Sequence, residues 1–154
     1  MSKDRFLLLD PAEVRPGRVP LPPAFAVKAM TADTEGRFSL LEVVLARPIP
    51  RHVHDAADEC IYVLDGELGI EFDDHSYTAG TGCFTLLPRG VPHALHPVST
   101  PPPRVLQISS PGGWEHYLED LFEAGPAVLT DGHLDPAKIN PIAAAYDIRY
   151  EERT

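Results

Sequence analysis

The chain has 154 residues, of which 44% are hydrophobic and 23% charged, and its net charge at pH 7 is −10. This composition excludes a disordered chain and indicates one globular unit of ordinary domain size. The acidic excess argues against nucleic acid and anionic membranes as partners, because both bind clustered Lys and Arg. No run approaches the ~20 apolar residues of a membrane span, and "MSKDRFLLLD" is not a secretory signal, so we expect a cytoplasmic protein.

The first part of the chain is rich in proline, of which the whole sequence holds 17. Proline at this density excludes long helices and suits short strands joined by tight turns. Residues 1–36 are therefore predicted to form an N-terminal arm with one or two strands, in "RFLLL" and "AFAVKAM". The arm segment 11–24 could cross to a second subunit or wrap on its own chain, and we favour the first, which makes a homodimer the expected state.

Residues 37–110 contain the regular part of the pattern. Six short segments rich in β-branched and aromatic residues are separated by Gly, Pro and Asp turns: "FSLLEVVLA", "ECIYVL", "ELGIEFD", "HSYTA", "CFTLL" and "RVLQIS". Strict alternation in "ELGIEFD" indicates a strand with one buried face. Such spacing is typical of an all-β sandwich or barrel. Cys60 and Cys83 lie within two of these apolar segments, so we expect buried, reduced thiols.

Residues 111–154 are predicted to be a C-terminal helical segment of the same domain. In "WEHYLEDLFEA" the apolar side chains recur at helical spacing, so Trp114 and Tyr117 should pack inward while Glu115 and Glu119 face outward. A second helix should run from Pro136 to about residue 146, with Asp135 as its N-cap.

The stretch "RHVHDAADE" carries the candidate chemistry. On an extended strand His52 and His54 project to the same face, and a short turn at "DAAD" would return Glu59 to a neighbouring strand. His93 follows a Pro-x-Gly turn at the start of a later strand. Three imidazoles and a carboxylate suit one divalent ion, whether Fe, Mn, Ni, Co, Cu or Zn. The alternative is four unrelated polar residues on loops.

These residues resemble the two motifs of the cupin superfamily. His52, His54, Glu59 and Gly66 match G-x5-H-x-H-x3,4-E-x6-G, with Ala46 in place of the first glycine. The second motif, G-x5-P-x-G-x2-H-x3-N, is matched by these residues: Gly82, Pro88, Gly90 and His93, with Pro97 in place of the final Asn. The C-terminal part more loosely resembles the small quercetin dioxygenase-like cupins.

The resemblance implies a cupin fold, which is a conical double-stranded β-helix or jelly-roll barrel, here with a short C-terminal helical appendage. It also implies that His52, His54, Glu59 and His93 bind a metal ion. The best hypothesis is then a metal-dependent, dioxygenase-like oxygenase acting on a small aromatic or diketone-type molecule, with Glu59 as a possible general base. Two alternatives stay open: a non-oxidative enzyme such as a polyketide cyclase, isomerase or lyase, and a non-catalytic cupin that binds a small ligand.

An apolar pocket wall is expected around this site. The side chains predicted to form it are Phe38, Leu40, Ile61, Val63, Leu68, Ile70, Phe72, Phe84 and Leu86. The direction of Gln107 within "RVLQIS" is left open, because hydrophobicity alone would turn it outward. His75, His96, His116 and His133 are expected to be structural or solvated.

Overall fold

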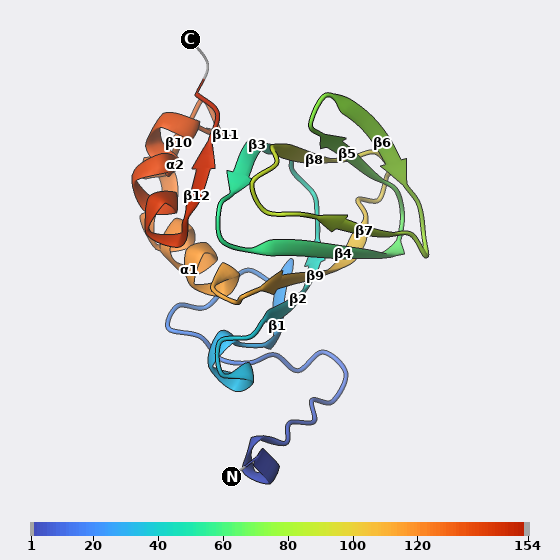
Figure 1. Ribbon diagram of the computed structural model, residues 1–154, viewed down its shortest axis with the longest axis vertical. Helices are drawn as coiled ribbons and strands as arrows, with labels where there is room; N and C mark the ends of the chain where they lie inside the picture. The colour runs from blue at the N-terminus through green and yellow to red at the C-terminus, as the bar shows by residue number, and fades with distance from the viewer. Residues whose placement is uncertain (1, 153–154) are drawn as a thin grey trace.

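A computed structural model describes residues 2–152 and shows two five-stranded antiparallel sheets that face each other (Figure 1). We call the first sheet A; its strands, in spatial order, are β1 (Phe25–Ala29), β2 (Ser39–Val44), β9 (Arg104–Ser110), β4 (Asp58–Asp65) and β7 (Phe84–Leu87). Sheet B consists, in spatial order, of β12 (Ile148–Tyr150), β3 (Ile49–His54), β8 (His93–Pro97), β5 (Leu68–Phe72) and β6 (His75–Ala79). The predicted all-β barrel is confirmed.

The core lies between the two sheets and follows the period-two alternation of the strands. In β2, Ser39, Leu41 and Val43 are buried while the residues between them are partly exposed. Phe84 and Leu86, in contrast, lie on the outer face of sheet A, so their predicted place in the inner wall is wrong. Phe38 is also exposed, and Leu40 is only partly buried. In β2 and β7 the residues predicted to face inward face outward. Apolar residues occupy both faces of these strands, so hydrophobicity alone could not tell the two faces apart.

The turn between β3 and β4 does not form the expected hairpin. β3 pairs with β8 and β12 in sheet B, whereas β4 pairs with β7 and β9 in sheet A. "DAAD" therefore carries the chain from one sheet to the other. This crossover makes Glu59 face His52 and His54 across the interior instead of standing beside them.

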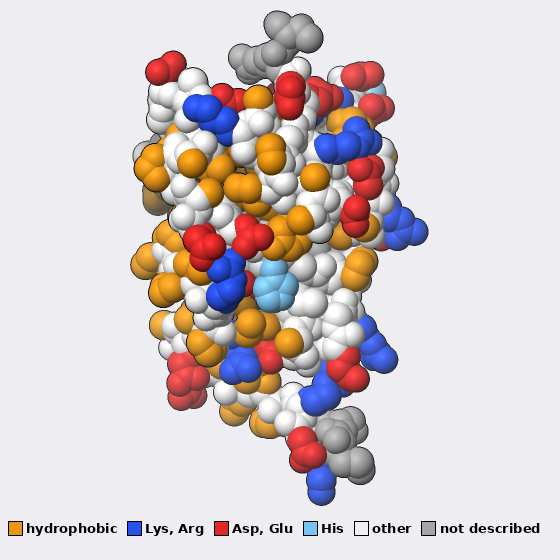
Figure 2. Space-filling view, turned by 90° about the vertical axis from the view of Figure 1, so that its left-hand side faces the viewer, with side chains coloured by type: hydrophobic (Ala, Val, Ile, Leu, Met, Phe, Trp, Pro, Cys, Tyr) orange, Lys and Arg blue, Asp and Glu red, His pale blue; other side chains and the backbone are white. Residues whose placement is uncertain are grey.

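The N-terminal arm has one strand, β1. The segment "RFLLL" is not a strand, and its first residue, Arg5, ends a short 3-10 helix (Ser2–Arg5). The arm lies against its own chain, where Arg18 contacts Asp120 and Glu123, each at 2.6 Å. Figure 2 shows the helical side of the molecule, on which acidic and basic side chains lie together among apolar ones.

The cysteine prediction fails for Cys83, which is exposed, and Cys60 is only half-buried.

The helix α1 (Trp114–Ala124) buries Trp114 and Tyr117 as expected, but Glu115 and Glu119 are also buried. The arm covers that face of the helix. Glu119 accepts a hydrogen bond from the Val19 backbone N–H at 3.0 Å, and Glu115 accepts hydrogen bonds from the backbone N–H and hydroxyl of Thr31. These carboxylates therefore tie the arm to the helix, which a helical periodicity cannot reveal.

The C-terminal segment contains α2 (Pro136–Ala143), capped by the Asp135 side chain as predicted, and a 3-10 turn (Ala144–Tyr146). A small ladder of β10 (Leu129–Thr130) and β11 (His133–Leu134) precedes it. β12 was not expected; it pairs with β3 and places Tyr150 opposite His52. Two further 3-10 turns are Thr31–Thr34 and Gly125–Val128. Within residues 2–152, none of the helices is long and apolar enough to span a membrane.

Candidate metal centre

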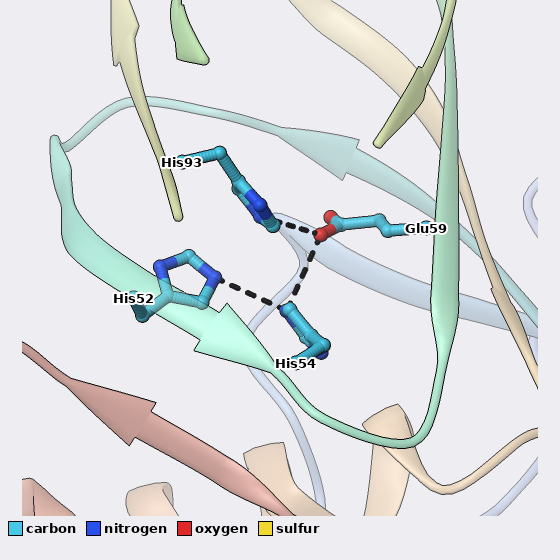
Figure 3. A group of neighbouring side chains, drawn as sticks. All are labelled: His52, His54, Glu59 and His93. Atoms are coloured by element: carbon cyan, nitrogen blue, oxygen red, sulfur yellow. Dashed lines mark hydrogen bonds and ion pairs between the residues drawn. The ribbon is translucent and has the colours of Figure 1, made fainter. Parts of the chain in front are cut away.

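Four side chains from both sheets converge in the interior (Figure 3). His52 and His54 come from β3, His93 from β8 and Glu59 from β4. Their nitrogen and oxygen atoms all lie within 4.8 Å of one another, and each residue is at most 4% exposed. The structure thus brings together all four residues that the sequence singled out.

The register of sheet B explains how the histidines meet. Tyr150, His52, His93 and Phe72 are successive partners across β12, β3, β8 and β5. Side chains opposite each other on neighbouring strands share a face, so the His52 and His93 rings lie with their centroids 4.4 Å apart. His54 lies two residues along β3 from His52 and faces the same side.

The tautomer of His52 is set by the backbone carbonyl of Pro50. Its Nδ1 lies 2.7 Å from the Pro50 carbonyl oxygen, and because a carbonyl can only accept, Nδ1 carries the proton. The lone pair of Nε2 then points at His54 Nε2, 3.1 Å away. Glu59 Oε2 lies 3.1 Å from His93 Nε2 and 3.4 Å from His54 Nε2. Donor atoms crowded in this way favour a cation between them.

The ionisation states also suit a cation. Burial, together with the charges of His93 and His54, lowers the pKa of His52 to about 3, and burial lowers the pKa of His54. Burial acts to raise the pKa of Glu59, but the hydrogen bond from His93 and the charges of the neighbouring imidazoles outweigh it and lower this pKa to about 2. At neutral pH His52 and His54 are therefore neutral donors and Glu59 is a carboxylate.

The spacing of the donor atoms tests whether an ion fits. Ligands at ~2.1 Å from one ion lie ~3.0–3.4 Å apart when adjacent. The contacts of 3.1 and 3.4 Å agree with this range. The group can hold one divalent metal ion, and three imidazoles with one carboxylate leave the choice among Fe, Mn, Ni, Co, Cu and Zn open.

Three residues around the cluster were not identified from the sequence. Gln107 on β9 is buried and its amide donates to Glu59 Oε1, so its direction, left open above, is inward. The Tyr150 ring stacks on His52 at 4.8 Å, and the Trp114 ring lies 5.4 Å from His54. The sequence does contain a signal for Gln107. Arg104 is charged and exposed at the start of β9, so strand alternation directs the odd-numbered residues, Gln107 among them, inward.

The other histidines lie outside the cluster. His75 is exposed on β6, and His133 is exposed on β11. His96 is directed away from the interior and its ring covers Gly69. His116 Nδ1 donates to Glu119 Oε1 on the helical side, 2.9 Å away. Among the described residues, none of these four joins the metal-ligand group.

The family model described as "Cupin domain" matches residues 40–109, which contain all four clustered residues. The comparison with curated proteins finds no match. Among solved structures, KdgF from a Halomonas species has a TM-score of 0.51 at 17% identity, over 63% of this chain and 87% of that one. This likeness concerns the fold.

Two further solved structures have lower TM-scores. A conserved protein of unknown function from Streptococcus pyogenes has a TM-score of 0.41 at 25% identity, over 47% of this chain and 61% of that one. Pac13 from Streptomyces, described as a nucleoside dehydratase, has a TM-score of 0.45 at 13% identity, over 53% of this chain and 65% of that one. The chain thus spans less than two thirds of the length of either protein.

Proposed function

We propose that this chain, whose residues 40–109 match the cupin domain model, is a metal-dependent, dioxygenase-like enzyme acting on a small aromatic or diketone-type molecule. The observation that carries the proposal is the convergence of three imidazoles and one carboxylate in a buried, mostly apolar interior. His52, His54, Glu59 and His93 would hold the metal, and a redox-active ion there would supply Lewis acidity and one-electron chemistry with dioxygen.

The residues around the cluster support an apolar substrate. The barrel interior next to it is aliphatic, with Ile61, Leu87 and Leu95 buried, and the aromatic rings of Tyr150 and Trp114 lie against His52 and His54. Arg and Lys do not appear among the buried polar or charged residues of the described chain. A phosphorylated or strongly anionic substrate would lack its usual partners there.

Glu59 acts in this proposal first as an anionic ligand. Gln107 holds Oε1, so Oε2, the oxygen nearest His54 and His93, is the one left for the ion. The low pKa of Glu59 makes it a weak base, since proton transfer is most efficient when the pKa of the base is near the working pH. The role of Glu59 as a general base stays a prediction that depends on substrate binding.

The test begins with elemental mass spectrometry of protein purified without added metal or chelator. The wild type should contain close to one Fe, Mn, Ni, Co or Cu per chain, and the His52→Ala/His54→Ala variant should lose it. His75→Ala is the matched control, because this exposed histidine lies outside the cluster. Oxygen uptake is then measured with flavonol- and 1,3-diketone-type compounds.

The outcomes separate the candidate functions. A redox-active metal and substrate-dependent oxygen uptake would support the oxygenase. Zinc that is lost in the double variant, with no oxygen uptake, would overturn the oxygenase and favour non-oxidative lyase, isomerase or cyclase chemistry on the same ligands. Equal metal content in the wild type and the double variant would overturn the metal site itself.

A further inference from the structure

Three buried side-chain atoms in the described part of the chain lack a hydrogen-bond partner, and all three lie around the candidate metal centre. They are Ser39 Oγ, His93 Nδ1 and Trp114 Nε1. His93 belongs to the cluster, and the Trp114 ring lies 5.4 Å from His54. Buried polar groups are almost always hydrogen-bonded, so unpaired ones call for an explanation. Their concentration in one part of the barrel indicates that this part receives a polar group from a ligand.

Ser39 lies in the same row of inner-face side chains as Glu59. Strand register places Ser39 opposite Ser109 and Ser109 opposite Glu59, and all three are at most 6% exposed. Partners in register share a face of the sheet, so these side chains project into the interior side by side. Ser39 and Glu59 are two strand intervals, or ~9–10 Å, apart. The Ser109 hydroxyl donates to the Pro111 carbonyl at 3.0 Å, whereas the Ser39 hydroxyl is unpaired.

Trp114 begins α1 at the end of the barrel where β2 starts and β9 stops; α1 follows β9 directly (Figure 1). The backbone N–H of Gly112 donates to the Gly36 carbonyl at 3.1 Å, which holds the start of the helix beside the segment that leads into Ser39. Trp114 is only 6% exposed, and its indole nitrogen can only donate a hydrogen bond. Since the Ser39 hydroxyl can donate as well, this end of the barrel offers two unpaired donors.

We propose that Ser39 and Trp114 determine which substrate the metal centre accepts, by donating hydrogen bonds to a neutral carbonyl oxygen at the end of the substrate opposite the metal. This inference rests on the proposed function, because it takes the other end of the substrate to be held at the cluster. Two donors select an acceptor. None of the buried polar or charged residues of the described chain is Lys or Arg, so a neutral carbonyl fits better than a carboxylate. The substrate class is thus an aromatic molecule with an ionisable oxygen at one end and a carbonyl group at the other.

The test compares two catechols on the zinc-loaded, full-length protein, because zinc has no redox chemistry that would oxidise them. 3,4-Dihydroxyacetophenone carries a carbonyl group opposite its two hydroxyls, and 4-ethylcatechol has a methylene in place of that carbonyl. Isothermal titration calorimetry measures the Kd of each, and the ratio of the two values is the carbonyl preference of the protein. The acetyl group also makes the catechol more acidic, so the preference is compared between the wild type and its variants, where this effect cancels.

Ser39→Ala and Trp114→Phe should each lower the carbonyl preference by about three- to tenfold, which is the effect of one hydrogen bond. Ser39→Ala removes only a hydroxyl, and Trp114→Phe keeps an aromatic ring, so a general loss of packing weakens both catechols alike and cancels in the ratio. Ser109→Ala is the matched control. Its hydroxyl lies in the same row but is already bonded to the Pro111 carbonyl, so the preference should stay unchanged.

Stability provides a second readout, which a merely structural role of Ser39 would move in the opposite direction. Ser39→Ala removes a buried hydroxyl that has no partner, so the midpoint of urea unfolding should not fall. Ser109→Ala breaks a hydrogen bond and should lower the midpoint. A lower midpoint in Ser39→Ala would overturn the inference, because the hydroxyl would then be used within the protein itself.

Zinc content, measured for every variant, separates this inference from the proposed function. An unchanged carbonyl preference in either Ser39→Ala or Trp114→Phe, with zinc bound, would overturn the joint role of the two residues and leave the metal centre intact. The same holds for a zinc-loaded wild type that binds neither catechol. Loss of zinc from either variant would also overturn the inference, because the side chain would then support the metal and not the substrate. Equal metal content in the wild type and His52→Ala/His54→Ala, in contrast, would overturn the proposed function itself.

Discussion

Gln107 donates its side-chain amide to Oε1 of Glu59, across the two adjacent strands β9 and β4. This contact occupies one carboxylate oxygen and leaves Oε2 directed at His54 and His93. A group that orients a metal ligand in this way typically contributes 10- to 100-fold to metal affinity. Gln107 is therefore a positioning residue of the candidate metal centre.

Replacing Gln107 by Leu should weaken Co²⁺ binding by about 10- to 100-fold, because Glu59 would be free to rotate. Competition with a chelating dye measures the affinity, and the visible spectrum of the Co²⁺ protein should change as the carboxylate reorients. Ser109→Ala is the control: Ser109 is buried on the same strand, but its hydroxyl donates to the Pro111 carbonyl. Equal affinities in the wild type and Gln107→Leu would contradict the positioning role.

Tyr150 anchors the C-terminal strand to the cluster through its ring on His52 and the hydrogen bond from the Tyr117 hydroxyl, 2.8 Å long. Tyr150→Ala should lower the free energy of unfolding by about 3–5 kcal/mol, as for other large-to-small core substitutions. Tyr150→Phe keeps the ring and should cost about 1 kcal/mol. Urea unfolding measures both, and similar losses in the two variants would show that the stacked ring contributes little.

The imidazole of His96 covers Gly69, its register partner on β5. A Cβ at position 69 would lie 2.2 Å from His96 Cε1, so Gly69→Ala requires the ring to move. We expect a loss of about 1–3 kcal/mol in the free energy of unfolding, the range for overpacking. The double variant Gly69→Ala/His96→Ala should recover most of it, which a double-mutant cycle measures. Additive effects would contradict a steric origin.

Asp33 should make the stability of the arm dependent on pH. Hydrogen bonds from Arg15 hold the pKa of Asp33 below its usual range, against the opposite effect of partial burial. A carboxyl with a depressed folded-state pKa stabilises the protein above its unfolded value of about 3.9, and this contribution is lost as the pH falls through the folded value.

The wild type should therefore be more stable than Asp33→Asn at pH 7 and pH 5, with the difference shrinking below about pH 4. Urea unfolding at pH 7, 5 and 3 measures the difference. Asp131→Asn, at an exposed turn, is the control and should show no comparable trend. If the difference in stability between wild type and Asp33→Asn stays constant down to pH 3, the contact between Arg15 and Asp33 does not depend on the ionisation of Asp33, and the prediction is wrong.

The sequence by itself determined the local structure and the identity of the clustered residues. Alternation and turn residues identified the strands of the barrel except β12, and Asp135 followed by Pro136 marked the start of α2, because these signals act within a few residues of chain. The spacing of His52 and His54 placed both rings on one face for the same reason. Their ligand role, drawn from the resemblance, stays a proposal that metal analysis will test.

Only the tertiary structure decided which elements meet. Glu59 faces the histidines from the opposite sheet, although "DAAD" reads as a hairpin, because pairing with distant strands outweighs a short turn. Glu115 and Glu119 are buried because an arm about 100 residues away in sequence covers them. The contact of Gln107 with Glu59 likewise depends on the register of β9 against β4. Such contacts join residues far apart along the chain, and local periodicity contains no information about them.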